Sequence, residues 1–180
     1  RVRDAVAGAA LNAPPQALLC ANLHALDLMS EHLYAPDSPL SRIAGRVVLE
    51  VTERSGLYRV DHLTSRIAKL RELGYRIAVD DLGASHAGLS SFRQLGPDIV
   101  KLDVSLVRDV DSFASKASLI KSMIALCTQD LGMRVVCEGV ETEGERDMLQ
   151  SVGADLLQGN LFGAPTRGFQ HAGPVASVAS

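Results

Sequence analysis

Polar and acidic residues stand where successive short apolar runs of the chain end. The run IAV leads directly into Asp80 and Asp81, and the run RVVLEV carries Glu50 and is followed by Glu53. A single acid at a strand end can cap the next helix or face water. Six strand ends in succession instead favour a shared site, made of Asn22, Glu50, Glu53, Asp80, Asp81, Lys101, Asp103, Glu138, Glu141 and Gln158.

Carboxylates brought together in this way repel one another, and burial without a partner raises their pKa values. Bound divalent cations remove that cost. Oxygen ligands suit Mg²⁺ or Mn²⁺, whereas a site without Cys or His is unsuited to zinc. The adjacent Asp80 and Asp81 can each face one of two metals, or one of them can bridge both.

Two neighbouring metals activate water and stabilise the attacking and leaving oxygens of a phosphoryl group, so phosphodiester hydrolysis is the expected reaction class. Lys101 could stabilise phosphate charge or orient the water, and Gln158 could hydrogen-bond substrate or nucleophile. A second interpretation of Lys101 is a structural ion pair with one of the acids.

The elements that must position these residues are six short apolar runs that alternate with segments of helical spacing. The runs lie near residues 17–23, 46–53, 75–81, 98–103, 133–141 and 155–162. Three of the helical segments end on Gly74, Gly132 and Gly153, as helices commonly do. Alternating strands and helices predict a parallel sheet, because parallel neighbours need a crossover connection.

Two architectures satisfy this pattern, an open doubly wound sheet and a (β/α) barrel. No GxGxxG fingerprint follows any of the strands, which disfavours a dinucleotide-binding fold. Barrel enzymes place their chemistry at the carboxyl ends of the strands, where the polar residues of this chain lie. The sequence therefore predicts a TIM-like (β/α) barrel.

The composition of the chain indicates an ordinary globular protein. It has 180 residues, of which 47% are hydrophobic and 22% charged, with a net charge of −3. This balance gives no general attraction to DNA, RNA or an anionic membrane. No stretch approaches the roughly 20 apolar residues of a membrane span, and the first residues lack a secretory core, so we expect a cytoplasmic protein. Cys20, Cys127 and Cys137 are widely spaced and are predicted to be buried free thiols.

Three stretches of the chain together resemble the EAL family of bacterial phosphodiesterases, which hydrolyse cyclic di-GMP to linear pGpG. They are LEVTE, DDLGASHAGLSSFRQLGPDIVKLDVSLV and VVCEGVETEGERDMLQSVGADLLQGNLFGAP, and the resemblance covers about residues 17–166. It implies a TIM-like barrel with Mg²⁺ or Mn²⁺, in a protein that commonly dimerises. The metal ligands that it implies are Asn22, Glu50, Asp80, Asp81 and Glu138.

The resemblance also assigns roles to four further residues. Lys101 and Gln158 resemble the residues around the catalytic water, Glu141 resembles a further active-site acid, and Glu53 resembles the acid that holds the loop after the aspartate pair. On this basis we expect residues 1–167 to form the EAL-type barrel domain and residues 168–180 to form a tail without catalytic function.

The chain departs from the EAL pattern in two places. The Glu-Ala-Leu motif and the arginine after it are missing, so we expect the first one or two strands of the barrel to be absent from this chain. The loop DDLGASHAGL carries Leu82, Ala84, Ser85 and His86 where the family has Phe, Thr, Gly and Tyr. We interpret His86 as a surface histidine.

The leading hypothesis is thus a metal-dependent cyclic di-GMP phosphodiesterase. The altered loop and the missing motif motivate an alternative, an EAL-like module that binds cyclic di-GMP or a protein without turnover. A third hypothesis is a metal-assisted barrel enzyme with another substrate, because a fold alone does not specify function.

Overall fold

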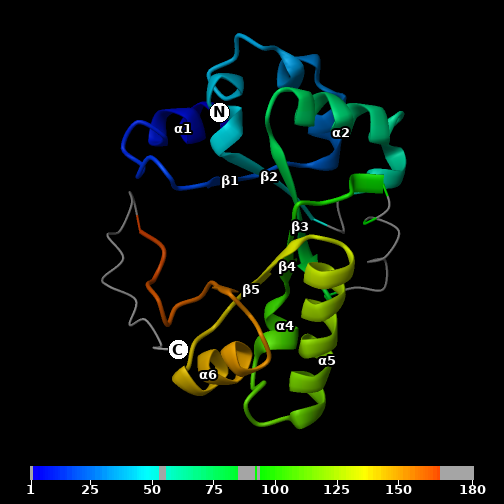
Figure 1. Ribbon diagram of the computed structural model, residues 1–180. Helices are drawn as coiled ribbons and strands as arrows, with labels where there is room; N and C mark the ends of the chain where they lie inside the picture. Colours follow the sequence, from blue (N-terminus) through cyan, green and yellow to red (C-terminus); the bar gives the residue numbers. More distant parts are fainter. Residues whose placement is uncertain (1, 53–55, 85–91, 93, 167–180) are drawn as a thin grey trace.

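The computed structural model describes residues 2–52, 56–84, 92 and 94–166. Its six strands are all parallel and neighbour one another in chain order, without the reversal of order that defines a doubly wound sheet. The strands are β1 (Leu19–Asn22), β2 (Val47–Thr52), β3 (Arg76–Leu82), β4 (Ile99–Leu102), β5 (Arg134–Cys137) and β6 (Leu156–Leu157). They form a curled half-barrel, which confirms the predicted fold class (Figure 1).

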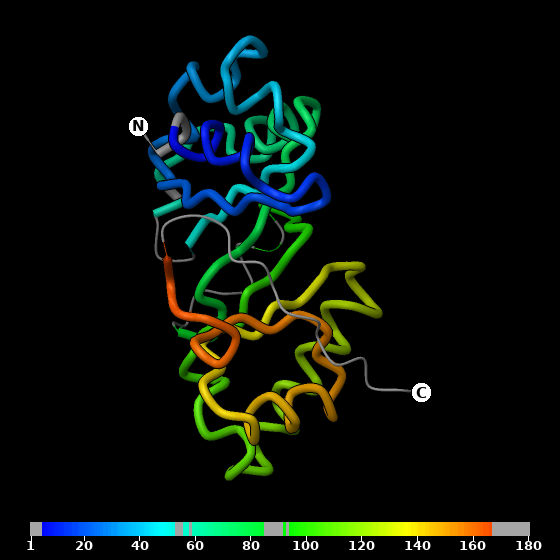
Figure 2. Tube along the Cα trace, turned by 90° about the vertical axis from the view of Figure 1, so that its left-hand side faces the viewer, coloured from blue at the N-terminus to red at the C-terminus, as the bar shows by residue number. Residues whose placement is uncertain are grey.

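The helices lie outside this sheet. The α-helices are α1 (Val2–Ala9), α2 (Leu63–Glu72), α4 (Val104–Val107), α5 (Ala114–Ala125), which continues into the π-helical η5 (Leu126–Asp130), and α6 (Glu143–Ser151). The predicted glycine ends of three helices are confirmed, because Gly74, Gly132 and Gly153 all have positive φ. Figure 2 shows the elements of the first half of the chain at one end and α5 and α6 at the other.

The connection between β1 and β2 contains no α-helix, contrary to the expected alternation. It consists of the 3-10 helices η1 (Ala25–Met29), η2 (Glu31–Tyr34) and η3 (Ser41–Arg46), and another, η4 (Leu57–Arg59), follows β2. Pro36 and Pro39 interrupt the connection, and proline inside an α-helix removes a hydrogen bond and clashes with the preceding turn. Short 3-10 turns accommodate both prolines.

Strand alternation divides the apolar side chains between the two faces of the sheet. On the outer face, one cluster that includes Leu49 and Ile77 packs under α2, and a second that includes Leu102 and Ile120 packs under α5 and α6. A small third cluster of Val48, Ala78 and Ile99 fills the inner face. The carboxyl end of the inner face is left for polar residues.

No helix of the described residues is both long enough and apolar enough to span a bilayer. The predicted tail, residues 168–180, lies outside the described residues.

Candidate functional site

The register of the sheet brings the inner-facing polar residues into one row. Asn22 of β1 pairs with Glu50 of β2, and Thr52 pairs with Asp80 of β3. On the other side, Lys101 of β4 pairs with Val136 of β5, two residues before Glu138. Parallel strands end at the same edge, so these side chains meet at the carboxyl rim of the sheet.

A β-bulge explains the two adjacent aspartates. Val79 and Leu82 of β3 pair with Val100 and Leu102 of β4, so β3 has one residue more than its neighbour over this interval. Asp81 adopts φ 59°, in the left-handed region, and its N–H donates to Asp80 Oδ1 at 3.0 Å. The extra residue lets both aspartates serve the rim while Leu82 returns to the outer core.

Lys101 is the centre of the site. Its Nζ lies 2.6 Å from Glu138 Oε1, 2.9 Å from Glu50 Oε1 and 3.3 Å from Asp80 Oδ1. The side chains of Lys101 and Glu50 are only 8% and 7% exposed. One ammonium group therefore compensates three carboxylates, which are carried by β2, by β3 and by the residue directly after β5. The sequence had suggested, as one interpretation, a structural ion pair of Lys101 with a single acid.

The electrostatic balance of this cluster shows in two pKa values. Burial alone would lower the pKa of Lys101, but the close approach of the Glu138 and Glu50 carboxylates outweighs it, so the pKa is raised. Burial raises the pKa of Glu138, and Asp80 adds to this increase while Lys101 opposes it. The three carboxylates thus carry more negative charge than the ammonium group of Lys101 neutralises.

The residues present fit a divalent cation. Asp80, Asp81 and Glu138 each offer a carboxylate oxygen, and these oxygens lie within 4.8 Å of one another. Among the described residues, Glu50 Oε1 is the buried side-chain oxygen without a hydrogen bond, because its close approach to Lys101 Nζ lacks hydrogen-bond geometry. Carboxylate oxygens with spare acceptor capacity are the ligands that Mg²⁺, Mn²⁺ and Ca²⁺ prefer.

The remaining predicted site residues are distributed more widely. Asn22 and Gln158 are exposed at the rim, on β1 and directly after β6. The Glu141 carboxylate accepts a 2.6 Å hydrogen bond from Arg108 Nη1, so the structure pairs it with that arginine and not with Lys101. Asp103 caps α4 by accepting a hydrogen bond from the Ser105 N–H. Glu53, Ser85 and His86 lie outside the described residues.

Two expectations from the sequence were incomplete. The prediction of three buried thiols is wrong for Cys20, which is exposed because it alternates with the outer-facing Leu19 and Ala21 and so faces the open side of the sheet. Sequence reasoning also missed Arg108 and the buried Glu145. The pattern Thr142-x-x-Glu145 is a helix capping box, and it could have singled out Glu145.

Comparison with known proteins matches residues 5–165 of the chain to the sequence family described as the EAL domain. The chain is 35% identical over 117 residues to the cyclic di-GMP phosphodiesterase NbdA of Pseudomonas aeruginosa, covering 65% of this chain and 15% of NbdA. It is 33% identical over 119 residues to the probable cyclic di-GMP phosphodiesterase PdeA of Escherichia coli, covering 66% of this chain and 16% of PdeA. The chain thus spans less than a fifth of either relative.

Solved protein structures are also similar to this chain. The manganese and cyclic di-GMP complex of Klebsiella pneumoniae BlrP1 at pH 9.0 has a TM-score of 0.80 at 34% identity, covering 91% of this chain and 43% of BlrP1. The EAL domain of Mycobacterium smegmatis DcpA has a TM-score of 0.71 at 27% identity, covering 80% of this chain and 66% of that one. The similarity extends over most of the chain and includes the strands of the site.

Proposed function

The chain belongs to the EAL domain family, and from this membership we propose that it is a metal-dependent phosphodiesterase that hydrolyses cyclic di-GMP to linear pGpG in bacterial signalling. The observation that carries the proposal is the buried Lys101 among Glu50, Asp80 and Glu138 at the carboxyl ends of parallel strands. The names of NbdA and PdeA and the ligands of the BlrP1 complex support the same reaction.

Mg²⁺ or Mn²⁺ is the proposed cofactor, as a pair of ions. Its proposed ligands are Asn22, Glu50, Asp80, Asp81 and Glu138, all at the rim of the half-barrel. When bound, such ions lower the pKa of a water molecule and neutralise charge on the phosphate. The manganese and calcium complexes of BlrP1 with cyclic di-GMP support a divalent ion without selecting one.

In the proposed reaction, a water oxygen forms a bond to one phosphorus, the ester bond to the leaving oxygen breaks, and one proton passes from the water to the leaving group. The ammonium of Lys101 would stabilise the charge that develops on the phosphate oxygens and hold the water. The Gln158 amide would hydrogen-bond the substrate or the water, while Glu141 and Glu53 would support the loops of the site. We place this activity in the cytoplasm and in a homodimer.

The test is an assay of the 180-residue chain with cyclic di-GMP and Mn²⁺ or Mg²⁺, with pGpG followed by chromatography. Asp80→Asn should abolish product, because it removes a charged rim oxygen. The matched control Asp130→Asn changes an exposed aspartate of η5 and should leave the rate unchanged. Absence of product with saturating metal, or equal product from Asp80→Asn, would contradict the proposal.

A second candidate is a receptor module that binds cyclic di-GMP without hydrolysing it. The sequence at the end of β3 and in the loop after it favours this candidate, because Leu82 and Ala84 stand after the aspartate pair where the family has Phe and Thr. Tight binding of cyclic di-GMP by calorimetry, with no pGpG formed, would favour this function. Turnover of other phosphodiesters or of carboxylic acids in a substrate panel would instead favour a different metal-assisted enzyme.

A further inference from the structure

The loops that follow β3 and β5 meet on the short helix α4. Gly83 has φ 102° and packs against Leu106, and Gly139 has φ 75° and packs against Val104. At both positions an added methyl group would overlap the α4 side chain. The helix therefore lies in direct contact with Gly83, two residues after Asp81, and with Gly139, the residue after Glu138.

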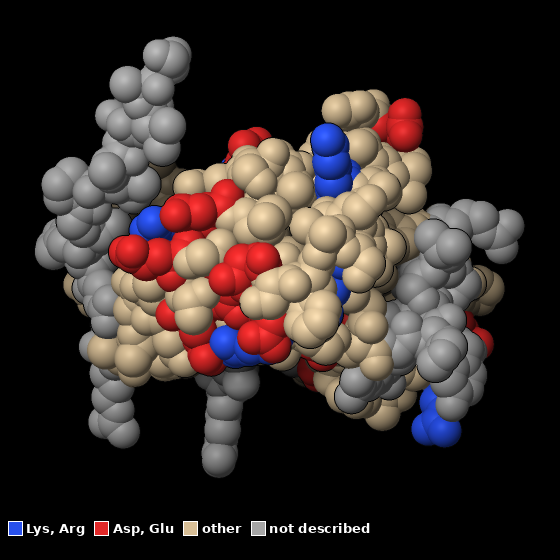
Figure 3. Space-filling model, turned by 90° about the horizontal axis from the view of Figure 1, so that it is seen from below, with Lys and Arg blue, Asp and Glu red and all other residues tan. Residues whose placement is uncertain are grey.

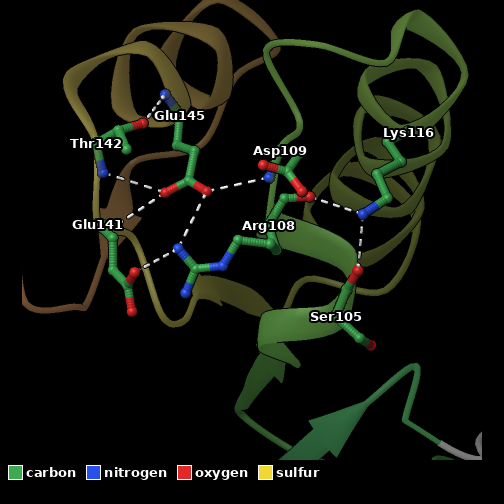
Figure 4. Close-up of polar contacts among 7 residues, drawn as sticks. All are labelled: Ser105, Arg108, Asp109, Lys116, Glu141, Thr142 and Glu145. Atoms are coloured by element: carbon green, nitrogen blue, oxygen red, sulfur yellow. Dashed lines mark hydrogen bonds and ion pairs between the residues drawn. The ribbon is translucent and has the colours of Figure 1, made fainter.

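Glu145 joins the end of α4 to the loop after β5. Its side chain is only 2% exposed. Its Oε2 accepts hydrogen bonds from the N–H groups of Glu141 at 2.8 Å and Thr142 at 3.2 Å, and its Oε1 accepts one from the Asp109 N–H at 3.1 Å. A helix cap needs only the bond to Thr142. The other two bonds tie together two separate loops (Figure 4).

Arg108 makes a second connection between the same loops. Its Nη1 donates to Glu141 Oε2 at 2.6 Å and lies 3.5 Å from Glu145 Oε1. Its carbonyl oxygen accepts a 2.6 Å hydrogen bond from Lys116 Nζ of α5, which also donates to the Ser105 carbonyl at 3.0 Å. Both ends of Arg108 are thus fixed, and Figure 4 shows the guanidinium group directed to the two glutamates.

The charge around Arg108 makes this arginine necessary. Figure 3 shows acidic side chains gathered on the lower face of the molecule with few basic ones between them. The exposed acids of these loops and of the start of α6 include Asp109, Asp111, Glu141, Glu143 and Asp147. Without Arg108, the buried Glu145 and its neighbour Glu141 would repel each other with no cation between them.

We infer that Arg108 and Glu145 are positioning residues that hold Lys101 and Glu138 at their working separation. Arg108 lies seven residues after Lys101, at the end of α4, and Glu141 lies three residues after Glu138. The network therefore joins the two segments that carry Lys101 and Glu138 a short distance beyond the site. The 2.6 Å contact of Lys101 Nζ with Glu138 Oε1 is the one that it protects. Only the predicted change in kcat rests on the proposed function; the predicted change in the Lys101 to Glu138 distance does not.

The test compares Arg108→Gln, Glu145→Gln and the control Arg146→Gln in the 180-residue chain. Arg146 lies on the same helix as Glu145 but pairs with the exposed Glu143 and Asp147, so it joins no two loops. Because displacements near 1 Å can cost up to 100-fold in rate, kcat should fall roughly 10- to 100-fold in both test variants, with little change in KM. Arg108→Lys should keep part of the kcat that Arg108→Gln loses, since lysine retains the positive charge but not the planar guanidinium group.

Crystal structures of the wild type and of Glu145→Gln supply a readout that does not depend on turnover. We expect the Lys101 to Glu138 contact to open in the variant, and Mn²⁺ titration by calorimetry to show weaker binding. Retention of that contact, or folded variants with kcat equal to that of the control, would overturn the inference. A wild type without activity would refute the proposed function, and the crystal structures would still decide the positioning role.

Discussion

Replacing Lys101 with methionine isolates the charge at the centre of the site. Methionine fills a similar apolar volume, so the variant chiefly removes the ammonium group that lies 2.6, 2.9 and 3.3 Å from Glu138, Glu50 and Asp80. All three carboxylates are largely shielded from water, with side-chain exposures of 17%, 7% and 13%. Among the described residues, the variant leaves them with no neutralising partner.

The size of the effect follows from two independent arguments. Removing one partner from a buried charge pair costs about 3–5 kcal/mol. Alternatively, one carboxylate can escape the repulsion by keeping a proton. Holding a glutamate with an unfolded pKa of about 4.3 protonated costs about 3.7 kcal/mol at pH 7 and about 1 kcal/mol at pH 5. We therefore expect Lys101→Met to lose about 4 kcal/mol at pH 7 and far less at pH 5.

The sign of the pH dependence is fixed by the two shifted groups. The raised pKa of Glu138 means that its charged form disfavours the folded state, so stability declines as the pH rises from the ordinary glutamate pKa through the raised value, and the total decline is larger once Lys101 is gone. The raised pKa of Lys101 stabilises the wild type below the ordinary lysine pKa and is lost only as the pH rises through the folded value. Both shifts predict that Lys101→Met loses the most free energy of unfolding at neutral and mildly alkaline pH.

Urea unfolding monitored by circular dichroism at pH 5 and pH 7 measures the loss. Mn²⁺ should stabilise Lys101→Met more than the wild type, because the cation replaces the missing charge, and a ligand at 100 times its Kd adds about 2.7 kcal/mol. Lys121→Met on the exposed face of α5 is the matched control. A loss below about 1 kcal/mol at pH 7, or an equal loss at both pH values, would refute the electrostatic reasoning.

Three further predictions concern residues outside the Lys101 cluster. Gly139→Ala should lower the free energy of unfolding by about 1–3 kcal/mol, since alanine is strained at φ 75° and overlaps Val104, while Gly45→Ala, which has open space, should have a much smaller effect in the same urea titration. Backbone hydrogen bonds and Arg108 lower the pKa of Glu145 despite its burial, so the wild type should lose stability as the pH falls through that pKa. The free energy of unfolding of Glu145→Gln should fall less between about pH 5 and pH 2, and an equal fall in both proteins would argue against this. Burial raises the pKa of the Cys137 thiol to about 12, so Cys137 should react with a thiol reagent at pH 8 only after urea is added, and rapid labelling of the native chain, located by mass spectrometry, would contradict its placement.

The arrangement of the strands could be predicted because each strand carries its signal locally. Apolar runs, terminal glycines and polar residues after Val51, Val79 and Leu102 specify elements and their ends without knowledge of any distant contact. The chemistry of the rim followed from residue types alone, because several acids converging on one edge need a cation. These features depend on periodicity and charge, which are visible in a linear chain.

The partners of individual side chains could not be predicted in the same way. Nothing local distinguishes Asp103, which caps a helix, from Asp80, which contacts Lys101. Glu141 resembles an active-site acid, yet its carboxylate is bound by Arg108, 33 residues earlier in the chain. Such pairings depend on how loops from different strands pack against one another, and that packing is a tertiary property.

The extra residue in β3 makes this strand sensitive to length as well as to residue type. Side chains alternate along a strand, and the bulge resets the phase of that alternation between Val79 and Leu82. With both aspartates present, an unbroken phase would direct Leu82 into the polar interior of the half-barrel, whereas deleting either aspartate would leave Leu82 opposite Leu102 on the outer face and only one aspartate at the rim. A one-codon deletion there should therefore preserve the outer core but remove one carboxylate from the site, so the length of β3 sets how many aspartates reach the rim.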